Sequence, residues 1–213
     1  MNTAKITVVL VDDHAIVRAG FRLLLATESD IDVIAEASRG EEILQIYSEL
    51  KPDIVVMDLS MAGIGGLETT RRLVMREDNA KIIVFSVHHE KVYVQRALDA
   101  GARGYICKHA HPDMLIDAIK QVAKGRIYID PSLVDDAQHQ EDMTPYQTII
   151  ATLSPREFDV FVLLAKGMTA HQISDELCLS YKTVANYGTT IRSKLNVTSM
   201  AQLANIATLL KPF

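Results

Sequence analysis

The sequence predicts an α/β domain with a doubly wound parallel sheet, followed by a smaller domain made only of helices. Up to about residue 124, five short β-branched runs alternate with amphipathic stretches. From Leu153 onward only the helical spacing of apolar residues remains. A chain of 213 residues is long enough for two small domains, each with its own core. We therefore predict one domain over 1–128, a linker over 129–150 and a second domain over 151–213.

The strands of the first domain are predicted from apolar runs that have the length of a buried strand. They lie at 6–11, 33–35, 53–58, 82–86 and 104–108. Amphipathic stretches that predict helices follow at about 14–27, 40–50, 65–77, 90–100 and 112–124. Strict alternation of this kind requires right-handed crossovers, so all five strands should be parallel.

The segment 129–150 has a different composition from the domains on either side. It carries five acidic and no basic side chains, with prolines at Pro131 and Pro145. Low hydrophobicity and charge of one sign favour a solvated linker. A short helix packed against either domain is the alternative.

The second domain begins with a strong helix-start signal. Ser154 is placed to cap the helix, Pro155 fits the first helical position, and Glu157 completes a capping box. A later helix should begin under Ser180, whose hydroxyl can cap it. The four predicted helices cover about 154–167, 170–177, 180–195 and 199–210.

Charge and cysteine content limit the classes of function. The net charge is −5, but 151–213 has six basic and four acidic side chains, so only this part favours an anionic partner. Cys107 and Cys178 belong to no CxxC pair, which indicates reduced, buried thiols in a cytoplasmic protein. The first apolar run is too short for a signal peptide, and no stretch approaches the ~18–20 apolar residues of a membrane span.

Three carboxylates are predicted to lie together at one edge of the sheet. Asp12 and Asp13 follow the first strand, and Asp58 closes the third. Because the carboxyl ends of parallel strands meet at the same edge, these acids should repel one another unless cations offset them. Mg²⁺ together with Lys108, at the end of the fifth strand, would balance the charge. The sequence therefore predicts a magnesium site suited to phosphoryl transfer.

These residues resemble the receiver domain of two-component response regulators, which has a flavodoxin-like fold. The resemblance implies that Asp58 accepts a phosphoryl group from a sensor histidine kinase. It implies that Asp13 and the Ser60 backbone carbonyl bind Mg²⁺ beside Asp58, and that Asp12 acts mainly through a water molecule. Lys108 and Ser86 would contact the phosphoryl oxygens, and Tyr105 would turn inward behind them. The matching residues, in type, order and strand placement, are Asp12, Asp13, Asp58, Ser86, Tyr105 and Lys108.

The family's mechanism implies a switch driven by charge. An acyl phosphate adds about one negative charge and three acceptor oxygens, which bias a surface between two states. In the resembling family this surface controls dimerisation. The chain departs from the family at Ala62 and His109, where prolines are common. We also hypothesise that Ser60 and His88, each two residues beyond a site residue, flank the path of water to the acyl phosphate.

The stretch 153–210 resembles the LuxR/FixJ-type DNA-binding domain, a helix-turn-helix whose second helix enters the major groove. The family commonly has lysine and histidine where Ala185 and Tyr187 stand, and Gly188 lies inside the helix. The motifs that match lie at 153–157, 164–167, 173–177, 179–184 and 194–197. The implied contacts to double-stranded DNA are Lys182, Thr183, Asn186, Thr190, Arg192 and Lys194.

Together these resemblances predict a response regulator of the NarL/FixJ family, which is a transcriptional regulator and not an enzyme. It would bind promoter DNA as a homodimer when Asp58 is phosphorylated. One alternative keeps the phosphorylation switch but gives the C-terminal domain a protein partner instead of DNA. A carboxylate and Mg²⁺ phosphatase is a further alternative, but it generally needs a second aspartate where Ser60 stands.

Overall fold

The computed structural model describes residues 5–89, 91–133, 149–150, 152–199, 202–203 and 205–206. The chain divides into two compact units.

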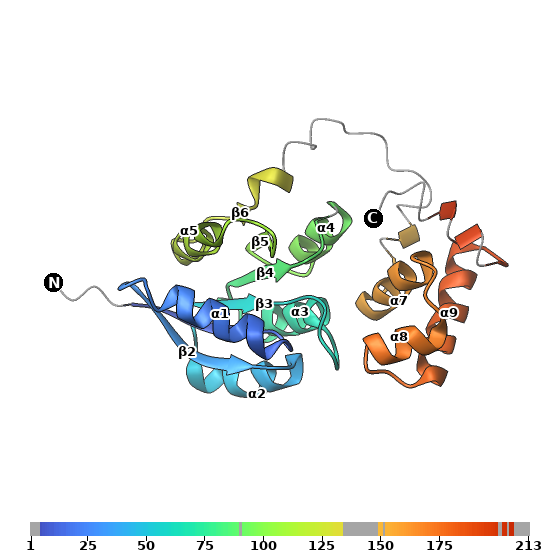
Figure 1. Cartoon of the computed structure of the whole chain (residues 1–213), viewed down its shortest axis with the longest axis horizontal. Helices are drawn as coiled ribbons and strands as arrows, with labels where there is room; N and C mark the ends of the chain where they lie inside the picture. The colour runs from blue at the N-terminus through green and yellow to red at the C-terminus, as the bar shows by residue number, and fades with distance from the viewer. Residues whose placement is uncertain are drawn as a thin grey trace. The chain divides into compact units, whose positions relative to one another are not determined.

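The described residues of the first domain form a six-stranded parallel sheet in the order β2-β1-β3-β4-β5-β6 (Figure 1). The first five strands follow the flavodoxin order, in which the chain changes direction between β1 and β3. This switch point places the carboxyl ends of β1 and β3 beside each other. The strands are β1 (Ile6–Val11), β2 (Ile31–Ala37), β3 (Ile54–Met57), β4 (Ile82–Ser86), β5 (Gly104–Cys107) and β6 (Tyr128–Ile129).

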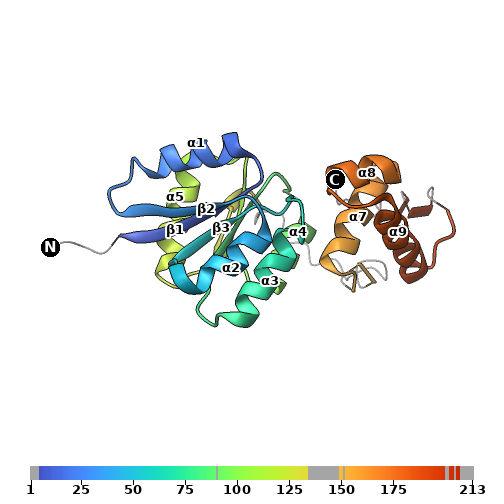
Figure 2. The same ribbon diagram turned by 90° about the horizontal axis from the view of Figure 1, so that it is seen from below.

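Helices cover both faces of this sheet, as a doubly wound fold requires (Figure 2). One face is covered by α1 (Ala15–Leu25) and α5 (Pro112–Ala123), and the other by α2 (Gly40–Leu50), α3 (Gly66–Arg76) and α4 (Lys91–Asp99). Side chains of alternate strand positions belong to different core clusters, with Val8 and Leu10 in one and Val9 and Val11 in the other.

The sheet has one strand more than the five that were predicted. β6 has only two residues, too few for hydrophobic periodicity to reveal it. It pairs with β5 and leads into a short 3-10 helix, η1 (Pro131–Leu133). Asp130 between them is 1% exposed and accepts hydrogen bonds from the Cys107 amide and from Ser132. The first residues of the segment predicted to be a solvated linker are therefore packed against β5, while 134–148 lies outside the described residues.

The second domain is helical, with α7 (Pro155–Ala165), α8 (Ala170–Glu176) and α9 (Tyr181–Leu195). The capping box at Ser154 and Glu157 is present, and Ser180 caps α9 as predicted. α9 packs against both α7 and α8. Of the predicted helix at 199–210, residues 202, 203, 205 and 206 are helical, and most of its other positions lie outside the described residues. No helix in the described ranges is both long and apolar enough to cross a membrane.

The two cysteines differ in exposure, which corrects one expectation. Cys107 is buried in β5, but Cys178 is exposed. Cys178 has a φ of +50° and follows the last turn of α8, so it occupies a left-handed turn position at the surface instead of a core position. Both thiols are free.

Candidate functional site

The carboxyl ends of β1 and β3 bring the predicted acids together. Val11 and Met57 are partners in the paired strands, so the residues that follow them, Asp12 and Asp58, are neighbours. Asp12 is 6% exposed and Asp58 only 2%. One ligand atom from each of Asp12, Asp13, His14 and Asp58 lies within 4.8 Å of the others. Three carboxylates thus lie together in one pocket.

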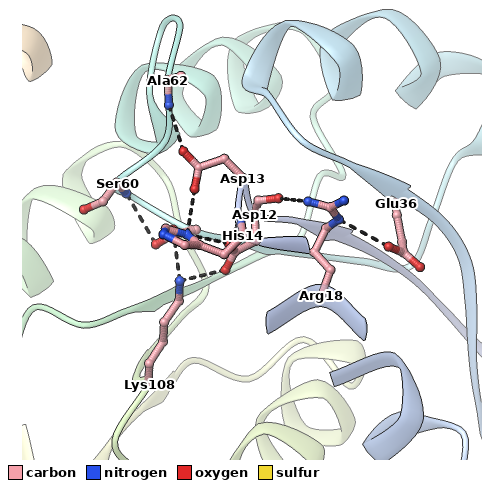
Figure 3. A network of polar contacts seen from close by, with 9 residues as sticks. Asp12, Asp13, His14, Arg18, Glu36, Ser60, Ala62 and Lys108 are labelled. Atoms are coloured by element: carbon pink, nitrogen blue, oxygen red, sulfur yellow. Dashed lines mark hydrogen bonds and ion pairs between the residues drawn. The ribbon is translucent and has the colours of Figure 1, made fainter. Parts of the chain in front are cut away.

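Lys108 lies between the two buried acids of this pocket. Its Nζ is 2.7 Å from Asp12 Oδ2 (Figure 3). The same atom is 2.9 Å from Asp58 Oδ2. Burial raises the pKa of Asp58 above its usual range; the Lys108 ammonium works against this shift and the Asp12 carboxylate adds to it. Burial also opposes the charged form of Lys108, but the Asp58 and Asp12 carboxylates outweigh it and raise the pKa of the ammonium group.

The loop after β3 folds closely around the acids. The Ser60 amide donates to Asp58 Oδ1 at 3.3 Å. The Ala62 amide donates to Asp13 Oδ2 at 3.2 Å (Figure 3). Gly66, the first residue of α3, lies so near Asp58 that a Cβ there would overlap the Asp58 carbonyl group. Only glycine fits this position, because the overlapping atoms belong to the backbone.

The sheet also positions Ser86, the last residue of β4, and Tyr105, which lies within β5. Both are fully buried. The Ser86 hydroxyl accepts a hydrogen bond from the His88 amide at 3.3 Å, and the Tyr105 hydroxyl donates to the His88 carbonyl at 2.7 Å. Tyr105 is therefore buried and bonded to the loop after β4, the same loop whose His88 amide donates to Ser86.

His88 and Ser60, which were hypothesised to flank a path for water, contact each other. A hydrogen bond of 3.0 Å joins Ser60 Oγ and His88 Nε2. The imidazole also stacks on Tyr93, with ring centroids 4.0 Å apart and an interplanar angle of 6°. These two contacts hold the half-buried histidine ring in place.

The structure adds a supporting pair that the sequence analysis missed. Arg18 donates from its guanidinium to the Asp12 carbonyl and pairs with Glu36 of β2 at 3.2 Å (Figure 3). Glu36 also pairs with Arg22 at 3.0 Å. A signal existed in part, since Arg18 lies six residues after Asp12 at the start of a helix, but nothing in the sequence selects Glu36 as its partner.

The donor set of the pocket fits a hard divalent cation. Three carboxylates face one lysine, so the pocket retains excess negative charge. Carboxylate oxygens are the ligands that Mg²⁺ prefers. His14 Nδ1, at 2.8 Å from Asp13 Oδ1 and 3.2 Å from Asp12 Oδ1, also interacts with these acids. The composition is therefore consistent with binding of Mg²⁺.

In the second domain, α9 has one buried face and one exposed face. The buried residues Val184, Gly188, Ile191 and Leu195 recur at helical spacing. The positions opposite them on the helix are Lys182, Asn186, Thr189 and Ser193, and all four are exposed. We call these four residues the α9 outer stripe. Thr189 was not among the predicted DNA contacts. Its position three residues after Asn186 could have indicated that the two side chains share one face of the helix.

The other predicted DNA contacts differ in their surroundings. Thr190 is exposed, whereas Thr183 is half-buried and bonded to the capping residue Ser180. Lys194 Nζ is 2.7 Å from Glu157 Oε2, so it joins α9 to the start of α7. Arg192 Nη2 lies 3.5 Å from the Thr189 hydroxyl.

Comparison with known proteins agrees with both parts of the chain. The family of response regulator receiver domains matches residues 8–120, and the family described as bacterial regulatory proteins, luxR family, matches 151–207. The response regulator GacA of Pseudomonas aeruginosa is 39% identical over 207 residues, 95% of each chain. The transcriptional activator protein ExaE of Pseudomonas putida is 40% identical over 202 residues, 94% of each. A crystal structure of a LuxR-family two-component response regulator from Aurantimonas sp. SI85-9A1 has 37% identity and a TM-score of 0.61, over 63% of this chain and 96% of that one.

A parallel α/β domain with an acidic pocket, joined to a helix-turn-helix domain, defines a response regulator that acts on transcription. The chain belongs to the NarL/FixJ family of two-component response regulators, with a receiver domain followed by a LuxR-type DNA-binding domain.

Proposed function

We propose that a sensor histidine kinase phosphorylates Asp58, and that this modification controls dimerisation and binding to promoter DNA. The observation that carries the proposal is the contact of Lys108 with both Asp12 and Asp58 inside a pocket of three carboxylates. In this proposal the chain is a cytoplasmic regulator rather than an enzyme. Its domains are a receiver over 1–128, a linker over 129–150 and a DNA-binding domain over 151–213.

The chemical step transfers a phosphoryl group from the kinase to this chain. A carboxylate oxygen of Asp58 attacks the phosphorus of the kinase's phosphohistidine, so that an O–P bond forms while the N–P bond breaks. Mg²⁺, held by Asp12, Asp13, Asp58 and the Ser60 carbonyl, would offset charge on the phosphoryl oxygens. Lys108 already contacts Asp58 and is placed to hold a phosphoryl oxygen as a point charge.

The switch arises because the phosphoryl group on Asp58 needs hydrogen-bond donors. A phosphoryl group brings about one extra negative charge and three acceptor oxygens. Ser86 would turn its hydroxyl toward these oxygens and away from the His88 amide, with which it now interacts. Because Tyr105 donates to the carbonyl of the same His88, a shift of this loop alters the packing of Tyr105 as well. The surface formed by β4, α4 and β5 would then change.

DNA contact is assigned to α9. Lys182, Thr183, Asn186, Thr190 and Arg192 are the proposed contacts to bases or phosphates, supported by the match of 151–207 to the luxR family. Lys194 was also predicted as a contact, but it would have to leave Glu157 to reach a phosphate. A dimer would meet two half-sites about one helical turn apart.

Sedimentation velocity with Mg²⁺, with and without a beryllofluoride mimic of the phosphoryl group, tests the proposal. We expect the wild type to shift from monomer to dimer with beryllofluoride, and Asp58→Asn to remain a monomer in both conditions. Asp99→Asn is a matched control, because Asp99 is a carboxylate at the end of α4 outside the pocket. A shift that persists in Asp58→Asn would contradict the role of Asp58, and no shift in the wild type would contradict control of dimerisation.

A protein-binding role for the second domain is the alternative function. It is favoured by one observation, that Lys194 is paired with Glu157 instead of being available to phosphates. Fluorescence anisotropy with genomic DNA fragments at low and moderate salt separates the two functions, since only the first gives salt-sensitive DNA binding.

A further inference from the structure

The α9 outer stripe carries short polar side chains, with one cation at its N-terminal end. Its members are Lys182, Asn186, Thr189 and Ser193. We propose that Asn186 and Thr189 read an A·T step in each half-site, Asn186 by bonding to adenine and Thr189 by packing its methyl group on thymine. The proposal rests on the DNA-binding function proposed above and adds which bases that function selects.

Asn186 is suited to adenine because its amide is free to bond outward. The side chain is exposed and makes no hydrogen bond within the described residues. A carboxamide offers one acceptor and one donor group, which match the N6 amino group and N7 of adenine in the major groove. Asn186 is the sixth residue of α9, in the part of a recognition helix that reaches base edges.

Thr189 is suited to thymine because its hydroxyl is engaged within the helix. The hydroxyl donates to the Ala185 carbonyl at 3.0 Å and accepts from Arg192 Nη2 at 3.5 Å. With the hydroxyl occupied, the methyl group is what the side chain can offer to a ligand. The only methyl group at the base edges of the major groove is the C5-methyl of thymine.

The spacing of the two residues fits neighbouring base pairs. Side chains three residues apart on a helix have Cβ atoms about 5–6 Å apart on the same face. Successive bases of one strand are about 3.4 Å apart along the axis. The stripe carries no arginine, the residue most suited to guanine by its bidentate geometry, and its lysine lies one turn before Asn186. Neither Asn186 nor Thr189 is therefore the residue type that best reads guanine.

The test starts from DNA that the full chain itself selects. Duplexes are enriched from a randomised pool with Mg²⁺ and beryllofluoride, and the affinity of the best duplex is then measured by anisotropy at one salt concentration. Each adenine is replaced in turn by 7-deazaadenine, which lacks N7, and each thymine by deoxyuridine, which lacks the methyl group. The same duplexes are measured with Asn186→Ala, Thr189→Ser and Thr189→Val, and thermal unfolding verifies that each variant is folded.

We expect each variant to lose sensitivity to one base change only. Asn186→Ala should weaken binding about tenfold and no longer respond to 7-deazaadenine at one position. Thr189→Ser keeps the hydroxyl but loses the methyl group, so it should bind three- to fourfold more weakly, about the effect of one buried carbon group, and ignore deoxyuridine at the adjacent position. Thr189→Val keeps a methyl group and should still respond to deoxyuridine.

Two results would overturn the inference, and they differ in what else they imply. If the chain selects a site but the variants respond to every modified base as the wild type does, the A·T assignment is wrong and DNA binding stands. If no duplex is enriched and none binds, the proposed DNA-binding function fails together with this inference.

Discussion

Ser60 and His88 form a hydrogen-bonded pair beside Asp58, each two residues after a residue of the pocket. The imidazole is held from one side by Ser60 and from the other by its stack on Tyr93. We expect a ring fixed in this way to restrict the approach of water to an acyl phosphate on Asp58, and exclusion of water slows hydrolysis.

Replacing this ring should therefore shorten the lifetime of the phosphorylated protein. We expect His88→Ala to lose its phosphoryl group several times faster than the wild type once the donor is removed, as followed by a phosphate-affinity gel. His89→Ala is the matched control, since His89 is the adjacent histidine and is exposed. Equal rates for His88→Ala and the wild type would show that the pair does not restrict water.

For single residues, the sequence predicted the location of those that directly follow a strand. Asp12, Asp58 and Lys108 each follow a strand of a parallel sheet, so the edge at which they meet can be inferred from the chain alone. Arg18 and Glu36 could not be paired in this way, because their contact depends on how α1 lies against β2. The sequence thus predicted the acids and the lysine of the pocket, but not the pairing of Arg18 with Glu36.

Among the helices, α9 contains a glycine, Gly188, with room for a methyl group. A Cβ at Gly188 would lie 3.7 Å from Leu164 Cδ1, an ordinary van der Waals distance. Alanine lowers the entropy lost on folding, so we expect Gly188→Ala to stabilise the second domain by about 0.5–1 kcal/mol. Thermal unfolding of the full chain followed by circular dichroism measures this. A lower midpoint would mean that α7 and α9 cannot accommodate the methyl group.

The ion pair between α7 and α9 makes the stability of the second domain depend on pH. Burial by itself would raise the pKa of Glu157, but Lys194 and the Ser154 amide outweigh it and hold the pKa below its ordinary value of 4.5. A carboxyl group whose pKa is lowered by folding stabilises the fold above its unfolded pKa, and this contribution disappears as the pH falls through the folded pKa.

The domain should therefore lose roughly 0.5–1 kcal/mol of stability on acidification below about pH 4.5, a small value because Lys194 is partly solvated. Denaturant unfolding at a series of pH values measures the loss. Glu157→Gln should abolish this loss of stability on acidification. Glu176→Gln, at the end of α8, is the control and should retain it. An unchanged pH profile in Glu157→Gln would contradict the assignment.

Prediction of the elements succeeded where periodicity extended over several turns or a full strand. All five predicted helices of the receiver are present with ends close to those expected. β6 was missed because two residues carry no pattern, and its pairing with β5 is a contact between segments far apart in the sequence. Short elements held by tertiary contacts are those that the sequence alone does not reveal.

For the molecule as a whole, charge is distributed unevenly between the domains. The chain has a net charge of −5, and the basic excess of 151–213 is small. Of the cations on α9, Lys182 and Arg192 are available to phosphates, whereas Lys194 is paired. A dimer would then make about four phosphate contacts through this helix.

Binding to the selected duplex should accordingly depend only moderately on salt. Each phosphate contact contributes about 0.9 to the slope of log K against log salt concentration, so we expect a slope of about −4 for the dimer. Lys182→Ala should reduce it by about two units, one for each copy of the chain. A slope steeper than about −7 would show that cations outside α9 carry much of the binding.

The close contact between Gly66 and Asp58 also affects which mutations the gene could tolerate. Any side chain at position 66 displaces the backbone of Asp58, although it removes none of the groups in the pocket. Natural variation in this regulator should therefore be as restricted at codon 66 as at codon 58. An inherited loss of signalling could thus arise from substitution of Gly66, a residue that has no side chain and takes no direct part in phosphoryl transfer.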